Sequence, residues 1–346
     1  MKSTTVPSEG GGGLDATTPA TLPPHPLHGP DAIWQETNCY IDLWVELLHA
    51  WGLDPHAALP FTVAQDFEGD HFTFFKYPQA DLETLYGTVV QEMAVYDTLL
   101  AHVVAQVERG HTVLVEVDSF YLPDTHATAY RREHVKTTVA IDYINPQAQR
   151  LSYFHSLGYH SAQDEDYRGL LRLSPELSGN GNILFPYAEC AKRVRPALAM
   201  PAMADASVAL MRQHLERLPA INPVSQWRQE FDAHMDTLLA RDEAYFHLYT
   251  FNLPRQLGAN FEMLHHWLRW LDEQGRGTTL TAEAAETASA IATEAKVLQF
   301  RLARAVARRR ADPCTQSLEA LESSYEKTID KLRAAFGPTV AVAAAA

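Results

Sequence analysis

The chain has 346 residues, of which 46% are hydrophobic, and a formal net charge of −15 at pH 7. This length exceeds one typical domain and the apolar content suffices for packed cores, so we expect two domains. The acidic balance argues against nucleic acid as a partner, because nucleic-acid binding requires cations that neutralise phosphates.

Membrane insertion and secretion are not indicated either. No apolar run approaches the about 20 residues that span a bilayer. Residues 1–30 lack the apolar centre of a signal peptide, and their Gly, Thr and Pro content predicts a disordered leader. The three cysteines are widely separated, which argues against a disulfide framework or a Cys-based zinc site. We therefore expect a soluble, cytoplasmic protein with no membrane partner.

The pattern of apolar residues predicts an α+β first half. The expected elements are a helix over 37–52, a strand over 71–78, a helix over 81–110, a strand over 111–123, and an antiparallel pair of strands over 134–145 and 150–161. From about residue 160 the chain predicts a connector with short helices. These elements place a catalytic α+β domain over 31–200.

The second half is predicted to be a helical bundle over 201–338, followed by a disordered tail over 339–346. Amphipathic periodicity begins at about Asp205. The expected helices cover 211–218, 224–252, 256–275, 281–310 and 315–337. Apolar surface on these helices permits a homodimer.

Cys39 is the leading candidate nucleophile. It lies where a polar Gln-Glu-Thr-Asn stretch gives way to an apolar helical pattern, in the first turn of a predicted helix. The free N–H groups and the positive dipole end of such a turn favour a thiolate. His134, at the start of a β-branched strand, could deprotonate the thiol and later protonate the leaving group. The alternative is a buried helix-capping cysteine and an exposed strand-edge histidine.

A third side chain should orient the His134 ring. We expect it on the strand that pairs with the His134 strand, where His155 and Ser156 are available. Asp142 lies on the His134 strand itself, about 26 Å further along, which excludes it.

Further candidates come from three places in the chain. For an oxyanion hole, the expected donors are the side chains of Gln35 or Asn38 with the Cys39 backbone N–H. Near a strand end, Asp118 and Tyr121 are substrate-site candidates, although Asp118 fits slightly better as the cap of the following turn. A polar run before a helix of the second half contains Asn252, Arg255, Gln256 and Asn260. Asn252 fits a helix N-cap, and the other three are candidates for lining a cleft between the domains. Asn252, Arg255 and Gln256 are also candidate oxyanion or substrate residues.

No metal site and no bound cofactor are predicted. The 16 histidines include no pair with a recognised ligand spacing, and no Gly-rich phosphate loop occurs. Arg301, Arg304 and Arg308 share one helix face. They form either a solvated helix end or a docking patch for an acidic protein.

Several segments together resemble the family of domain of unknown function 1839, over nearly all of the chain after the leader. They are NCYIDLWVELLHAWGLDP, VLVEVDSFYLPDT, REHVKTTVAIDYIN, LSYFHSLGY and FNLPRQLGANFEMLHHWLRWL. The first half is also similar, more distantly, to the N-terminal domain of butirosin biosynthesis protein H, a papain-like acyltransferase that moves an acyl group from a carrier-protein thioester to an amine.

The resemblance implies a papain-like cysteine-enzyme fold, with a helix bearing the nucleophile Cys39 and an antiparallel sheet bearing the base His134. It also implies a small acidic carrier protein as partner, which supplies an aminoacyl group on 4'-phosphopantetheine for transfer to an amine acceptor. Relatives carry an Asn after the YFH motif, where this chain has Ser156, so His155 or a backbone carbonyl is left to orient His134. The alternatives are a cysteine hydrolase with the same dyad, either a peptidase or a thioesterase, and a non-catalytic scaffold that binds the carrier protein.

Overall fold

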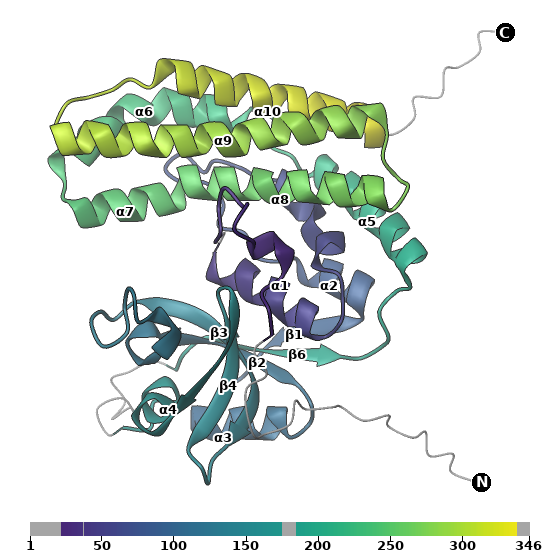
Figure 1. Cartoon of the computed structure of the whole chain (residues 1–346), viewed down its shortest axis with the longest axis vertical. Coiled ribbons are helices and arrows are strands. Elements are labelled where there is room, and N and C mark those ends of the chain that lie inside the picture. Colours follow the sequence, from purple (N-terminus) through teal and green to yellow (C-terminus); the bar gives the residue numbers. More distant parts are fainter. Residues whose placement is uncertain (1–21, 37, 175–184, 338–346) are drawn as a thin grey trace. The chain divides into compact units, whose positions relative to one another are not determined.

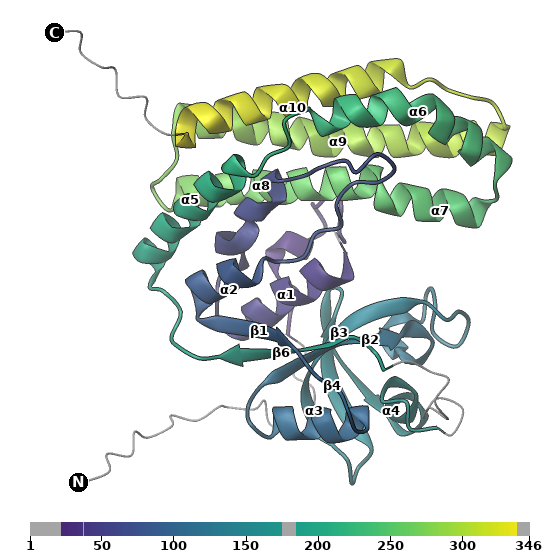
Figure 2. The ribbon, with the colours of Figure 1, turned by 180° about the vertical axis from the view of Figure 1, so that it is seen from behind.

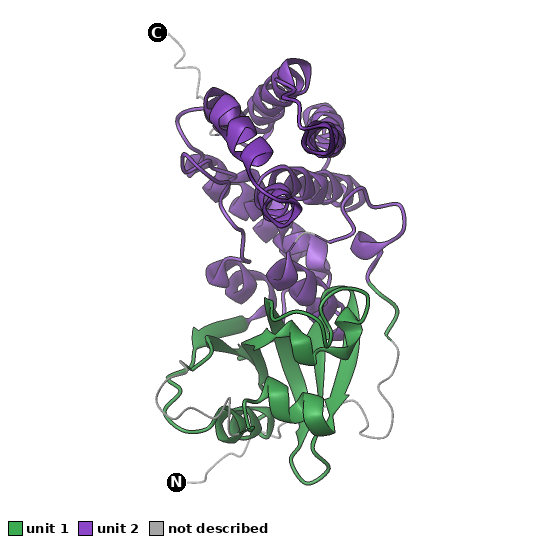
Figure 3. Ribbon diagram, turned by 90° about the vertical axis from the view of Figure 1, so that its left-hand side faces the viewer, with its two compact units in different colours: residues 1–24, 88–194 green, residues 25–87, 195–346 purple. Residues whose placement is uncertain are grey.

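The computed structural model describes residues 22–36, 38–174 and 185–337, and it is drawn from two sides in Figures 1 and 2. The chain divides into two compact units, coloured separately in Figure 3. Unit 1 comprises Met1–Pro24 and Thr88–Val194, and unit 2 comprises His25–Gly87 and Arg195–Ala346. Because residues 25–87 group with the C-terminal helices, the units do not follow the order of the chain.

Unit 1 is built on one antiparallel sheet of six strands in the order β1-β6-β2-β3-β4-β5. The strands are β1 (Thr88–Glu92), β2 (Thr112–Asp118), β3 (Lys136–Asn145), β4 (Arg150–His155), β5 (Gly158–Gln163) and β6 (Ala188–Arg193). Alternate residues of β2, namely Val113, Val115 and Val117, are buried in a core with residues of α3 (Leu99–Val107) and α4 (Asp164–Leu170). Burying each such side chain contributes about 1.5–3 kcal/mol to folding.

The predicted hairpin is confirmed, since β3 and β4 pair antiparallel across a turn at residues 146–149. The register shifts between Ile141 and Tyr143, which places Asp142 at a β-bulge. Sequence analysis did not separate β5 from β4, and it missed β6, because β6 pairs with β1 and β2, which are distant in the chain.

Two predicted elements of the first half are wrong. The helix expected over 81–110 is interrupted: α2 (Gln79–Tyr86) ends at Gly87, whose φ of 62° is left-handed, and β1 follows before α3 begins. The expected strand over 71–78 is absent from this described segment, where Phe72 forms only an isolated bridge with Phe67. Its aromatic rings pack individually instead, as in the contact of Phe61 with Phe75.

Unit 2 is helical in the part that the structure describes. Its helices are η1 (Pro26–His28), α1 (Cys39–Ala50), η2 (Pro55–Val63), α2, α5 (Met200–Glu216), α6 (Pro223–Ala240), α7 (Glu243–Asn252), α8 (Pro254–Glu273), α9 (Thr279–Arg308) and α10 (Thr315–Phe336). The leader predicted over 1–30 lies outside the described residues as far as residue 21, whereas Leu27 and His28 of η1 are buried. The prediction of disorder is therefore wrong for the described residues of this segment.

The C-terminal helices pack side by side, with α9 running along both α8 and α10 (Figures 1 and 2). Small buried residues of α9, such as Ala288, Ala292 and Ala295, allow this close packing. The single helix predicted over 224–252 is two helices, because Arg241 is extended and the Asp242 side chain caps α7 by accepting the Tyr245 N–H. The predicted tail over 339–346 lies outside the described residues.

Helix α8 also packs against η2 and the segment before α1. A Cβ at Gly258 would lie within 2.7 Å of three atoms of the Trp34 indole, so only glycine permits this approach. Within the described ranges, no helix is long and apolar enough to cross a bilayer.

Candidate functional site

Cys39 is the first residue of α1 in unit 2, as predicted, and its side chain is partly exposed. Asn38 caps this helix: its Oδ1 accepts the N–H groups of Tyr40 and Ile41 at 3.1 and 2.9 Å, and its Nδ2 donates to the Phe75 carbonyl at 3.1 Å. The Asn38 amide, predicted as an oxyanion donor, is therefore engaged as a helix cap. Gln35 is exposed.

His134 lies in unit 1, two residues before β3. Its Nδ1 is 2.6 Å from Asp118 Oδ2, and its ring stacks on Phe120 with centroids 4.5 Å apart and planes 12° apart. The side chain is 67% exposed. With Nδ1 directed to a carboxylate, Nε2 is the nitrogen that can exchange a proton with another group.

Asp118 supplies the carboxylate that orients this ring. It is the last residue of β2 and stands opposite Lys136 in the β2–β3 register, which brings it next to His134. Its Oδ1 also accepts the Phe120 N–H at 3.0 Å, so the interpretation of Asp118 as a turn cap is confirmed. Sequence reasoning did not predict the contact between Asp118 and His134, although the two residues lie at the end of one predicted strand and the start of the next.

His155, predicted to orient His134, belongs to a different network. Its Nδ1 is 2.5 Å from Asp124 Oδ2 and its Nε2 is 2.9 Å from Thr137 Oγ1. Asp124 also accepts the Tyr153 hydroxyl at 2.6 Å. Both nitrogens of His155 are thus engaged, and the side chains of His155 and Asp124 are buried. Ser156 lies in the β4–β5 turn with a left-handed φ of 46°.

Burial alone would raise the pKa of Asp124. The hydrogen bond from His155 and the charges of His155 and His160 outweigh burial and hold the pKa of this carboxyl below its usual range. The pair therefore resembles a structural ion pair that fastens η4 (Pro123–Thr125) to β4.

Tyr121, the other candidate near Asp118, is half-buried in η3 (Ser119–Tyr121). A Cβ added to Gly169 of α4 would lie 2.1 Å from the Tyr121 ring, so the ring packs closely on this helix.

The candidates before and within α8 make contacts inside unit 2. Arg255 donates to the Glu36 carbonyl at 2.5 Å and lies over the Trp34 ring, and Glu262 accepts the Trp34 N–H at 2.8 Å. These contacts hold the segment that leads to Cys39 against α8. Arg255 is thus placed to position this segment.

The other three polar residues of this run also lie within unit 2. Asn252 is the last residue of α7 and donates to the Leu248 carbonyl at 2.8 Å, so the prediction that it caps the next helix is wrong. Gln256 and Asn260 are fully buried, and Asn260 donates to Gln65 Oε1 at 2.6 Å.

Unit 1 contains a cysteine–histidine contact that the sequence analysis did not foresee. Cys190 Sγ in β6 lies 3.5 Å from His111 Nδ1 and 3.4 Å from Gln106 Oε1. Burial raises the pKa of the Cys190 thiol, despite the opposing charges of Lys192 and Arg109. Burial and the same two cations lower the pKa of His111. The pair is therefore an uncharged thiol and imidazole, which disfavours nucleophilic attack by Cys190.

Two family models match this chain and together cover most of it. The DUF1839 N-terminal domain matches residues 23–193, and the DUF1839 C-terminal domain matches residues 201–334. The chain belongs to the DUF1839 family. A search of curated proteins found no match.

The DUF1839 N-terminal domain contains both Cys39 and His134, but its residues fall in both compact units. Residues 25–87, with Cys39, belong to unit 2, whereas His134 and Asp118 belong to unit 1. The same domain brings together His25, Asp54 and His56, whose potential metal-ligand atoms all lie within 4.8 Å of one another. Their spacing in the chain gives no sign of this group.

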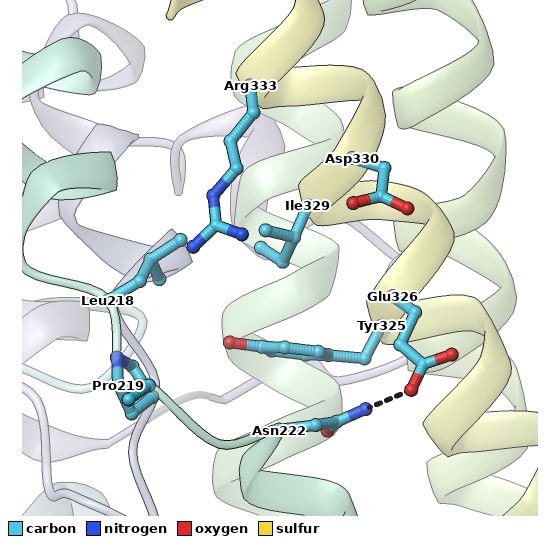
Figure 4. Close-up of a pocket in the computed structure, with 9 residues that line it drawn as sticks. Leu218, Pro219, Asn222, Tyr325, Glu326, Ile329, Asp330 and Arg333 are labelled. Carbon is cyan, nitrogen blue, oxygen red and sulfur yellow. Dashed lines mark hydrogen bonds between the residues drawn. The ribbon is translucent and has the colours of Figure 1, made fainter.

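The DUF1839 C-terminal domain contains a pocket of about 310 Å³ between α10 and the segment that joins α5 to α6 (Figure 4). Figure 4 shows the Arg333 guanidinium directed toward Leu218, with the Tyr325 ring below it and Asn222 bonded to Glu326 at 3.5 Å. None of the site residues predicted from the sequence lines this pocket.

Proposed function

We propose that this DUF1839 protein is a cysteine-dependent acyltransferase. It takes a small aminoacyl group from the 4'-phosphopantetheine thioester of an acidic carrier protein and passes it to an amine. The observation that supports the proposal is the Asp118–His134 contact of 2.6 Å. An imidazole oriented by a carboxylate, with its second nitrogen directed outward, is the base and orienter of a catalytic triad.

In the first half-reaction, Cys39 Sγ attacks the thioester carbonyl. A C–S bond to Cys39 forms and the C–S bond to the phosphopantetheine breaks, and His134, having taken the Cys39 proton, returns it to the departing thiol. In the second, an amine attacks the Cys39 thioester, His134 accepts the amine proton, and the C–N bond replaces the C–S bond. Asp118 holds the ring in position for both steps.

The free-energy changes suit this order of steps. Exchange of one thioester for another is nearly neutral in free energy, so the acyl-enzyme can accumulate, whereas transfer to an amine forms the more stable amide. Cys39 is the first residue of α1, so its side chain lies at the positive end of the helix dipole. Ping-pong kinetics follow from a covalent intermediate.

A papain-like fold is the second part of the proposal. Its support is the order of elements: a cysteine begins a helix, and a histidine follows later at the edge of an antiparallel sheet. The side chains of Cys39 and His134 must meet during turnover, which is a requirement that experiment can test directly.

The proposed docking surface for the carrier consists of Arg304 and Arg308 on α9. Both are exposed. Arg301, on the same face, is engaged within the fold by Asp312 at 2.8 Å and Ser317 at 3.2 Å. Two exposed arginines would attract an acidic carrier although the whole chain is acidic, because docking depends on local complementarity.

The decisive experiment is loading from a labelled aminoacyl carrier protein, followed by intact-mass analysis of wild type and Cys39→Ala. We expect wild type to gain one aminoacyl group and Cys39→Ala to gain none. Release of the group to added amines supports the transferase. Release to water alone would show a hydrolase, and absence of label from both proteins would show a non-catalytic scaffold.

A cross-linking experiment tests whether the side chains at positions 39 and 134 meet. His134 is replaced by Cys, and a short thiol cross-linker is added during incubation with the carrier substrate. We expect an intramolecular link between positions 39 and 134, identified by peptide mass. The matched control is His134→Cys with Cys39→Ser, which should give no link. A His134→Cys protein that remains unlinked would exclude the dyad.

A further inference from the structure

Four side chains of unit 2 that carry potential metal-ligand atoms lie close together, and Cys39 is not among them. His25 is the N-cap of η1, His49 is in the last turn of α1, Asp54 is the N-cap of η2, and His56 is in η2. Potential ligand atoms of His25, Asp54 and His56 all lie within 4.8 Å of one another. The starts of η1 and η2 thus direct ligand atoms to one point, and the His49 ring of α1 lies beside His25.

The ring geometry suits one shared ion. The centroid of the His25 ring lies 5.1 Å from that of His49 and 5.2 Å from that of His56, with interplanar angles of 72° and 61°. Around a tetrahedral zinc ion with Zn–N bonds of about 2.1 Å, imidazole centroids lie about 5 Å apart. The ligand atoms in such a site are about 3.4 Å apart, so the side chains would close by about 1 Å.

Asp54 already contacts His56. Its Oδ1 lies 2.8 Å from His56 Nδ1 and accepts the His56 backbone N–H at 3.0 Å, while its Oδ2 accepts the Trp270 Nε1–H at 2.7 Å. An ion bound by Asp54 Oδ1 and His56 Nδ1 would replace the hydrogen bond between these two atoms, which would move apart to the about 3.4 Å that separates neighbouring zinc ligands. The hydrogen bonds from the His56 backbone and from Trp270 would still hold the carboxylate in place.

We propose that His25, Asp54, His56 and His49 form a site for a divalent transition-metal ion, with Zn²⁺ as the best match. Imidazole and carboxylate ligands in a four-coordinate arrangement favour zinc over magnesium or calcium, which prefer oxygen ligands. Four protein ligands leave no open position, so the ion is structural: it joins η1 to the end of α1 and the start of η2. Coordination through His25 Nε2 requires the ring proton on Nδ1 and replaces the 3.2 Å contact from the Leu27 N–H.

The test is metal binding by untagged full-length protein that has been stripped with a chelator. Zn²⁺ affinity is measured by competition with a chromophoric chelator, and Co²⁺ is added separately because its visible spectrum reports tetrahedral coordination. His25→Ala and His56→Ala remove ligands. The matched control is His71→Ala, which removes a histidine whose Nδ1 lies 2.6 Å from Asp70 on the exposed surface.

We expect one zinc ion per wild-type chain, a tetrahedral Co²⁺ spectrum, and a higher melting temperature with metal than without it. Each ligand variant should bind at least about tenfold more weakly, and His71→Ala should bind as wild type does. If His25→Ala does not fold, His49→Ala and the wild-type Co²⁺ spectrum decide the question. Wild type without tight zinc binding, or ligand variants that bind as tightly as wild type, would overturn the proposal. The acyl-transfer assay is independent of these readouts.

Discussion

Two histidine–carboxylate contacts of unit 1 have the same geometry but different surroundings. His134 and Asp118 meet at 2.6 Å with the histidine side chain 67% exposed, whereas His155 and Asp124 meet at 2.5 Å with that side chain 5% exposed. The exposed ring keeps one nitrogen for other groups. The buried ring uses both, one for Asp124 and one for Thr137.

The difference teaches that burial decides the role of such a pair. Removing one member of a buried pair leaves a polar or charged group without solvent, which costs stability. An exposed pair contributes little to stability, because water replaces the lost partner. An exposed, oriented imidazole is therefore the better candidate for chemistry, and the buried one for structure.

The largest expected effect tests the exposed pair. His134→Ala should lower the rate of acyl transfer about 10²- to 10⁴-fold, because it removes the general base. Its free energy of unfolding should change by less than about 0.5 kcal/mol, as is usual for surface substitutions. Labelled-carrier assays and urea titrations measure the two quantities.

His71→Ala is the control, since it removes an equally short exposed contact, to Asp70. It should change neither rate nor stability. A His134→Ala protein with normal transfer rate but much lower stability would reverse the comparison.

The next effect concerns a buried histidine of unit 2 with two carboxylates. His28 Nδ1 lies 2.6 Å from Glu46 Oε1 and Nε2 lies 3.4 Å from Asp42 Oδ1. Burial by itself would lower the pKa of His28, but the hydrogen bonds and charges of Asp42 and Glu46 outweigh it and raise the pKa to about 9. His28→Gln removes this cation from beside two buried carboxylates.

We expect His28→Gln to lower the free energy of unfolding by about 3–5 kcal/mol. Denaturant titration by circular dichroism measures the change. Asp42→Asn combined with His28→Gln should recover part of the loss, because one of the two buried negative charges is removed. A single variant as stable as wild type would show that the pair adds nothing to the fold.

Sequence reasoning found the elements that local pattern determines. The helix that begins at Cys39, the strand β2 and the β3–β4 hairpin follow from apolar periodicity and turn residues. It missed β6, whose partners are set by tertiary pairing, and it read through the break at Gly87, where a left-handed residue ends the helix.

The candidate site divides in the same way. Cys39 and His134 could be selected from residue type and local setting. The contact between Asp118 and His134 could not, because it depends on the register that places Asp118 opposite Lys136. The group of His25, Asp54 and His56 depends on how η1 and η2 pack, which no spacing rule in the chain encodes.

A smaller effect is expected for the buried pair of His155 and Asp124. His155→Ala should lower the free energy of unfolding by about 2–3 kcal/mol, since Asp124 and Thr137 each lose one hydrogen bond in a buried setting. Its acyl-transfer rate, measured at temperatures below the unfolding transition, should remain within about threefold of wild type, because the proposed catalytic residues Cys39, His134 and Asp118 are unchanged. A loss of rate as large as that of His134→Ala, at unchanged stability, would instead assign His155 to the site.

The smallest effect concerns Asp142, a carboxyl at the β3 bulge that is hydrogen-bonded to a tyrosine and not to a histidine. Its Oδ1 accepts the Tyr159 hydroxyl at 2.8 Å. Burial raises the pKa of Asp142 to about 6, and the Tyr159 hydrogen bond opposes this only in part. Because the folded pKa lies above the unfolded value of about 3.9, ionisation opposes folding. Wild-type stability should therefore fall from this group as pH rises from about 4 to about 6, and then level off.

Asp142→Asn keeps an acceptor for Tyr159 and removes the charge. The variant should be as stable as wild type near pH 4 and more stable by about 1–2 kcal/mol above pH 6. This figure is less than the full free energy of a shift of about two pKa units, because the Asp142 side chain is partly exposed. Urea titrations across this pH range measure the difference. Asp124→Asn is the control of opposite sign: the pKa of Asp124 is held below its usual range, so neutralising that carboxyl should destabilise the protein at neutral pH. If both asparagine variants shift stability in the same direction, a histidine partner is not what separates a stabilising buried carboxylate from a destabilising one.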